Sequence, residues 1–111
     1  MPHVTEWDII ETAFFLTRVS YYDPRRNTDY FIAADVGFRP SPNLPSVSEC
    51  FEALEGLPDG HPLKRKFDLD KVRFGFEILP ELVSPDVHYG DITFIDRREI
   101  GLASPKYLRL N

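Results

Sequence analysis

The sequence has only one cysteine, Cys50, among its 111 residues. One thiol excludes a disulfide within the chain, and it excludes the paired cysteines of CxxC metal and redox motifs. The first ten residues, MPHVTEWDII, carry acids where a secretory signal peptide has a basic start and an apolar run. No apolar run approaches the roughly 20 residues that cross a bilayer. We therefore expect a cytoplasmic protein that does not enter a membrane.

Motifs that usually hold a cofactor or a metal are also missing. The three histidines, His3, His61 and His88, have none of the short spacings of a helical metal site. The six glycines are scattered and form no phosphate-binding loop. The neighbours of Cys50 provide no base that would activate its thiol. We predict no metal, no cofactor and no catalytic residue, although a site built from two carboxylates would leave no recognisable motif.

Acidic residues outnumber basic ones. The chain has 18 Asp and Glu against 13 Lys and Arg, which gives a formal net charge of −5 at pH 7. A nucleic-acid-binding domain usually has the opposite balance, because phosphate neutralisation supplies much of its affinity. Three short basic runs, at 25–26, 64–66 and 97–98, are typical of solvated turns. The charge balance predicts no direct binding to nucleic acid.

The composition is that of one folded domain. Hydrophobic residues make up 42% of the chain and charged residues 28%, which places it among globular proteins rather than disordered ones. The length is close to the commonest domain size, and no linker or repeat divides the chain. We expect a single domain over residues 1–111, with aromatic side chains prominent in its core.

The first part of the chain has the composition of β-strands. Residues 13–22, AFFLTRVSYY, and 30–38, YFIAADVGF, are rich in aromatic and β-branched side chains. Before them, Thr5 followed by Asp8 resembles the start of a capped helix, but alternating apolar residues favour a strand or irregular segment over 5–12. The sequence therefore predicts two strands that pair as a long hairpin.

The predicted hairpin loop, DPRRNTD at 23–29, carries Arg25 and Arg26 between two aspartates. In one interpretation the aspartates neutralise the arginines, each exposed pair contributing at most about 1 kcal/mol. In the other, the guanidinium groups bind an acidic or planar group on a partner. Arg25 and Arg26 are therefore candidate partner-binding residues.

A proline-rich connector at 38–46 precedes the clearest helix of the chain, over about 46–56. Ser46 and Glu49 have the spacing of a capping box, and Gly56 ends the helix. Its apolar face has the spacing i, i+3, i+4 and i+7: Val47, Cys50, Phe51 and Leu54.

The outward face of this helix is acidic, with Glu49, Glu52 and Glu55. Such a stripe is either a solvated surface or a patch that docks a basic partner and raises the association rate through complementary charge. We take these three glutamates as further candidate partner-binding residues.

The last third of the chain returns to a strand pattern. In KVRFGFEIL, at 71–79, apolar and polar positions alternate strictly, and strands also fit 88–96 and 106–110. The sequence thus predicts an α+β domain: a mainly antiparallel sheet of about five strands with one principal helix packed on it.

These features favour a protein-binding module over an enzyme. A small, acidic, cofactor-free domain suits an inhibitor or immunity-type protein that neutralises a basic target, such as a nucleic-acid-processing toxin, whose phosphate groove its carboxylates would occupy. Two alternatives remain open. One is a small enzyme or ligand-binding domain with an aromatic-lined pocket between sheet and helix. The other is a structural subunit of a larger assembly, which an uncovered aromatic sheet face would favour.

Overall fold

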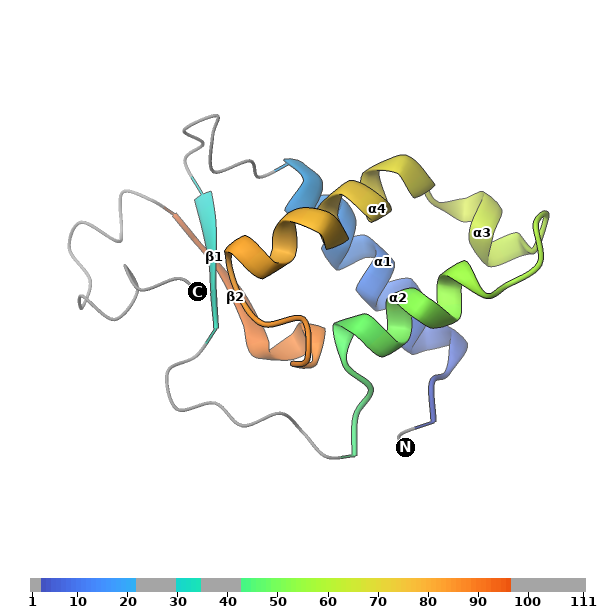
Figure 1. The fold of residues 1–111 in the computed structure, drawn as a ribbon, viewed down its shortest axis with the longest axis horizontal. Helices are drawn as coiled ribbons and strands as arrows, with labels where there is room; N and C mark the ends of the chain where they lie inside the picture. Colours follow the sequence, from blue (N-terminus) through green and yellow to red (C-terminus); the bar gives the residue numbers. More distant parts are fainter. Residues whose placement is uncertain (1–2, 22–29, 35–42, 97–111) are drawn as a thin grey trace.

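The computed structural model describes residues 3–21, 30–34 and 43–96, with 30–34 and 94–96 described as backbone only. Helices account for most of this part of the chain (Figure 1). In chain order the elements are α1 (Glu6–Tyr21), β1 (Tyr30–Ala34), α2 (Val47–Glu55), α3 (Pro62–Lys66), α4 (Leu69–Ile78), the 3-10 helices η2 (Leu79–Glu81) and η3 (Tyr89–Asp91), and β2 (Ile92–Asp96). The predicted α+β domain, built on an antiparallel sheet of about five strands, is therefore wrong.

Helix α1 begins at the capped start that the sequence suggested and that we did not favour. The Asp8 N–H donates to the Thr5 hydroxyl oxygen at 3.2 Å, and the Asp8 carboxylate accepts from the Thr5 N–H at 3.0 Å. This reciprocal pair is a capping box, which satisfies backbone donors that a helix start leaves open. The strand or irregular segment predicted over 5–12 is wrong for that reason.

The aromatic-rich segment predicted as a strand at 13–22 belongs to the same helix as far as Tyr21. The buried residues of α1 have helical spacing: Ile9, Thr12, Ala13, Phe15, Leu16 and Val19. Its hydroxyl side chains also fit a helix, because Thr17 donates to the Ala13 carbonyl and Ser20 to the Thr17 carbonyl. Packing against other helices thus overrides the β preference of these side chains.

Helix α4 replaces the strand predicted at 71–79. The Asp68 carboxylate caps its start by accepting from the N–H groups of Asp70 and Lys71, at 3.1 and 3.3 Å. The buried residues of α4 are Val72, Gly75 and Ile78. The apolar alternation suggested a strand because it assigned Gly75 to the solvent side, whereas Gly75 is a buried contact position.

Gly75 allows α4 to approach the backbone of α1. A Cβ atom at this position would overlap the Leu16 carbonyl oxygen and would lie 2.8 Å from the Leu16 carbonyl carbon. One turn earlier in α4, the Lys71 ammonium donates to the Tyr21 hydroxyl at 2.7 Å. Both contacts are with the second half of α1, where α4 crosses it (Figure 1). Helix α1 also packs against α2, so it is central to the helical part (Figure 1).

The helix predicted over 46–56 is confirmed as α2. Its capping box is present, since the Ser46 N–H donates to Glu49 Oε1 at 3.2 Å and the Glu49 N–H donates to the Ser46 hydroxyl at 3.1 Å. The buried residues of α2 are Val47, Cys50 and Leu54. The Phe51 ring stacks on Phe76 of α4, with ring centroids 4.2 Å apart. The helix packs against other helices, and not on a sheet as predicted.

The two strands that the structure describes pair with each other. β1 and β2 are antiparallel, with Tyr30 opposite Asp96 and Ala34 opposite Ile92. Ile92 at the start of β2 is buried and belongs to the hydrophobic core, so the first residue of this strand is joined to the helical part.

These strands match only part of the prediction. The strand predicted at 30–38 is confirmed over its described residues, and the one at 88–96 is confirmed over its second half, after η3. The predicted pairing of 13–22 with 30–38 is wrong, because α1 occupies the first segment. The predicted hairpin loop at 23–29 and the strand at 106–110 lie outside the described residues.

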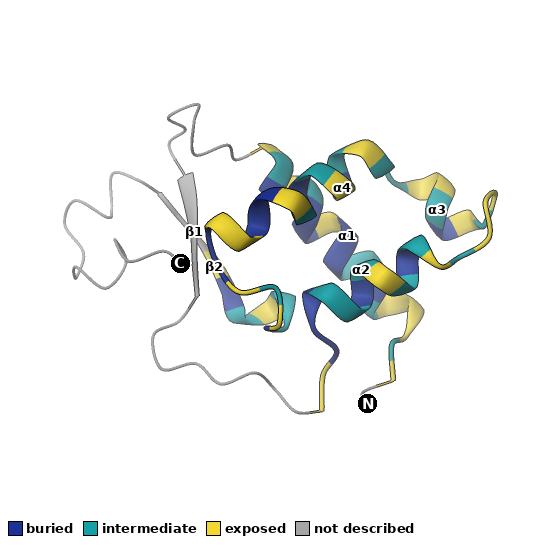
Figure 2. Cartoon of the chain, viewed as in Figure 1, coloured by how far each residue is buried: buried dark blue, intermediate teal, exposed yellow. Residues whose placement is uncertain are grey.

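The core lies between the helices and the segment that follows α4 (Figure 2). Its largest fully buried apolar side chains are Leu16, Leu54, Leu79, Leu82, Val19, Val47, Val72 and Val83. The N–H groups of Val47 and Ser48 donate to the carbonyls of Val87 and Pro85, which ties the start of α2 to that segment. Across the described ranges, no helix has both the length and the apolar character that crossing a bilayer requires.

The contact at Gly75 predicts the effect of Gly75→Ala. Alanine normally stabilises a helix by about 1 kcal/mol relative to glycine. Here the added methyl group would meet the α1 backbone, so we expect a net loss of about 1–3 kcal/mol in a urea titration. The control is Glu77→Ala, at an exposed position of α4, which should change stability little. A Gly75→Ala protein as stable as the parent would show that the helices do not meet this closely.

Candidate functional site

Of the glutamates predicted to form an acidic face, Glu52 lies on the side of α2 opposite its buried residues, and Glu49 and Glu55 lie on either side of it. Glu52 is exposed, whereas Glu49 and Glu55 are half-buried. Glu49 accepts the Ser46 N–H in the capping box, and Glu55 pairs with Arg73 of α4. The structure therefore brings the three glutamates onto one face, but two of them already make contacts within the chain.

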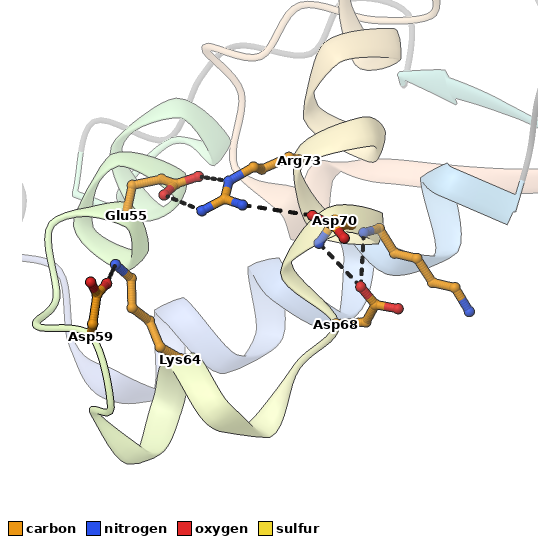
Figure 3. A network of polar contacts seen from close by, with 7 residues as sticks. Glu55, Asp59, Lys64, Asp68, Asp70 and Arg73 are labelled. Carbon is orange, nitrogen blue, oxygen red and sulfur yellow. Dashed lines mark hydrogen bonds and ion pairs between the residues drawn. The ribbon is translucent and has the colours of Figure 1, made fainter.

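The pair between Glu55 and Arg73 joins α2 to α4 (Figure 3). Arg73 Nε donates to Glu55 Oε1 at 2.6 Å, and a terminal guanidinium nitrogen donates to Oε2 at 3.1 Å, so the pair is bidentate. A further ion pair, 3.8 Å long, joins Arg73 to Asp70. The hydrogen bonds from Arg73 lower the pKa of the Glu55 carboxyl, an effect that partial burial opposes and nearby positive charge reinforces. Glu55 therefore stabilises the packing of the two helices.

Lys64 of α3 lies near this pair and adds to the positive charge that acts on Glu55. Lys64 Nζ lies 3.3 Å from Asp59 Oδ1, and only 10% of the Lys64 side chain is exposed, so its aliphatic stem is packed against the protein. The bases among residues 3–21 and 43–93 are Arg18, Lys64, Arg65, Lys66, Lys71 and Arg73. Positive charge in this part of the chain is thus confined to the end of α1, to α3 and to the first half of α4.

Acidic residues dominate elsewhere. Residues 3–17, 43–63 and 74–93 contain no Lys or Arg. Their acids are Glu6, Asp8, Glu11, Glu49, Glu52, Glu55, Asp59, Glu77, Glu81, Asp86 and Asp91. We call these three segments the acidic region. It comprises most of α1, all of α2 and the chain from the middle of α4 to the start of β2.

The beginnings of α1 and α2 meet η3 within the acidic region. Burial raises the pKa of the Tyr89 hydroxyl in η3, and the charges of Glu11 and Asp8 raise it further. Asp8 and Glu49 both act on the Cys50 thiol. Acids from the two helices are therefore close enough in space for their fields to add.

Cys50 lies among these acids, and its thiol is not activated. Burial raises the pKa of its thiol to about 11, and the charges of Asp8 and Glu49 contribute in the same direction. The Thr12 hydroxyl acts in the opposite sense, although it makes no hydrogen bond of normal geometry within the described residues. The thiol is thus protonated at neutral pH and behaves as a small buried hydrophobe.

Two of the histidines act as caps of short helices. His61 Nδ1 accepts from the Leu63 N–H at the start of α3, and His88 Nδ1 accepts from the Gly90 N–H at the start of η3, both at 3.1 Å. In both residues this contact places the proton of the neutral ring on Nε2. Across residues 3–21 and 43–93, no group of three or more His, Cys, Asp or Glu side chains is placed to hold a metal ion.

The remaining candidate residues, Arg25 and Arg26, lie outside the described residues. Both interpretations of the loop that carries them therefore stay predictions.

One surface was missed by sequence reasoning. Trp7, Phe14 and Tyr21 are 64%, 52% and 63% exposed. Their spacing of seven residues aligns them along α1, on the side opposite the buried Leu16. The spacing is visible in the sequence, but a strand would place Trp7 and Phe14 on opposite faces, so the strand interpretation concealed it. We call these three residues the aromatic stripe.

No protein-family model, curated protein or solved structure matches this chain. Its function is therefore inferred from its own surfaces.

The Glu55–Arg73 pair predicts a pH-dependent contribution to stability. Because the folded-state pKa of Glu55 is lowered, the contribution is present above the ordinary glutamate value of 4.5 and is lost as the pH falls through the folded-state pKa. Glu55→Gln should lower the unfolding free energy by up to about 1 kcal/mol near neutral pH, and by progressively less on acidification. The control is Glu52→Gln, at an exposed position on the same helix. Equal effects of the two substitutions across the pH range would contradict a stabilising pair.

The burial and raised pKa of Cys50 predict that its thiol reacts slowly. With a pKa of about 11 and a buried side chain, the native thiol should react with a disulfide reagent at least about tenfold more slowly than the thiol of the urea-unfolded chain at mildly alkaline pH. Similar rates in the two states would mean that the thiol is accessible and activated.

Proposed function

We propose that this chain is a small acidic protein-binding module that docks a basic protein partner, in the manner of an inhibitor or immunity-type protein. The observation that carries the proposal is the acidic region, whose three segments hold eleven acids and no Lys or Arg; of these acids, Glu55 and Asp59 pair with Arg73 and Lys64 from outside the segments. A surface of this kind attracts a basic protein over a distance comparable to the Debye length, about 8 Å at physiological ionic strength.

The exposed face of α2 is the part of the acidic region that suits docking. Glu52 is exposed there, and Glu49 lies beside it on the same face. The charge of Glu55 is largely balanced by Arg73, so Glu49 and Glu52 contribute more of the field that an approaching partner meets. Arg25 and Arg26 remain candidates for a second contact.

If the basic target binds nucleic acid, this chain could inhibit it by occupying its phosphate-binding groove. Its phosphate-binding groove presents Lys and Arg, and carboxylates on a docked protein would occupy the same groups. We propose the cytoplasm as the compartment, because the single cysteine provides no intrachain disulfide that an oxidising compartment would form. The chemistry of the described residues favours binding over catalysis, since Cys50 is buried and unactivated and His61 and His88 serve as caps.

The test begins with the tagged full chain, used to isolate a stoichiometric partner from the source organism. With that partner purified, association kinetics are compared for the parent and for Glu49→Gln/Glu52→Gln. Glutamine retains the capping box at position 49, so the double variant should fold normally. We expect it to associate several-fold more slowly at low salt, with the difference shrinking as salt screens the charges.

The matched control removes the same number of charges at Glu77 and Glu81, which are exposed near the end of α4 and in η2. The control should slow association less than the α2 variant. Equal slowing would assign the effect to net charge rather than to the α2 face. Recovery of a partner that is not basic, or of none, would contradict the proposed function.

A further inference from the structure

The aromatic stripe is an apolar surface whose three side chains are each more than half exposed. Of the large hydrophobic side chains exposed in that part of the chain, three belong to it: Trp7, Phe14 and Tyr21. Seven residues advance a helix by about 20° less than two full turns, so the three rings stay nearly in line over about 21 Å. Aligned exposed aromatic residues are typical of a binding surface, whereas scattered single ones are ordinary.

Neighbouring residues hold the stripe in place. The Phe14 ring meets Phe67 edge to face, with centroids 5.1 Å apart. The Lys71 ammonium lies 4.6 Å from the centre of the Tyr21 ring and donates to its hydroxyl. Rings fixed in this way lose little further freedom when a partner covers them, which favours association.

Charge is distributed unevenly along the stripe. Its N-terminal half is flanked by acids, of which Glu11 lies next to the line of the rings. Its C-terminal half is flanked by Arg18, which also interacts within the chain, and Lys71 of α4 stands at its end. A surface with an acidic half and a basic half is complementary to a copy of itself turned end for end.

We propose that the aromatic stripe docks on the same stripe of a second copy of this chain. The two α1 helices run antiparallel about a two-fold axis at Phe14, which places Trp7 opposite Tyr21 of the second copy and the two Phe14 rings together. Glu11 then lies beside Arg18 of the second copy. The dipoles of the two helices point in opposite directions, which is also favourable. A parallel arrangement would bring acid to acid and base to base, so charge selects the antiparallel one.

One pair of helices makes a small interface. Stable complexes usually bury about 800 Å² on each partner, and a single helix face supplies less. We therefore expect a reversible dimer with a dissociation constant in the micromolar range, about 1–100 μM. The dimer uses α1 rather than the outward face of α2, so it can be tested without the proposed basic partner.

The dimer is tested on the full chain by sedimentation and by fluorescence over the same protein concentrations. Trp7 is the single tryptophan, so the emission reports on the surroundings of the stripe. We expect a monomer–dimer equilibrium and a blue shift of the emission with the same midpoint. Phe14→Glu should weaken the dimer at least about tenfold. The control, Leu44→Glu, makes the same kind of change at another exposed apolar residue and should leave the dimer intact.

Charge reversal tests the antiparallel arrangement. Glu11→Arg and Arg18→Glu should each weaken the dimer, and the double variant should restore it, because both charges of each pair are then exchanged. A monomer up to about 200 μM would overturn the proposal and leave the stripe to another segment or protein. Three other results would also overturn the proposal. The first is a dimer that forms without the blue shift, and the second is a dimer that Leu44→Glu weakens but Phe14→Glu does not. The third is a double charge-reversal variant that does not recover dimer formation.

Discussion

The missing side chain of Gly75 is the constraint on which the arrangement of the helices depends. Because this glycine lies against the Leu16 carbonyl, α4 is close enough to α1 for Lys71 to reach Tyr21. On another side of the same helix, Arg73 reaches Glu55 of α2. A bulkier residue would push α4 outward and lengthen both polar contacts. The apolar packing thus decides which charges are paired and which remain available to a partner.

The sequence predicted local features better than it predicted the fold. The capping box of Ser46 and Glu49 requires residues three apart and no tertiary information, and α2 begins where the sequence placed it. The same logic applied to Thr5 and Asp8, but the β preference of the following aromatic residues was given more weight. In α4 the decisive residue was Gly75, whose burial follows from contact with a segment about sixty residues away. Local pattern alone does not contain that contact, so strands were predicted where helices pack together.

The candidate site shows the same limit. The spacing of Glu49, Glu52 and Glu55 in the confirmed helix α2 depends on the helix alone. It did not show that Glu55 is bound by Arg73, eighteen residues later in the chain. The aromatic stripe on α1 depends equally on helical geometry, and it became visible only once residues 13–21 were known to be a helix. Because this segment was predicted to be a strand, the aromatic stripe was not among the predicted surface residues.

The two proposed surfaces also fit together geometrically. The aromatic stripe lies on the side of α1 opposite its buried face, and Glu52 lies on the side of α2 opposite its own. A second copy bound along the stripe would therefore leave the outward face of α2 uncovered on both copies. Two linked acidic faces bind a partner with repeated basic sites more tightly than one face does, because the second contact forms within a complex already made. Self-association through α1 would in this way strengthen the docking of a basic partner without any change in the docking face itself.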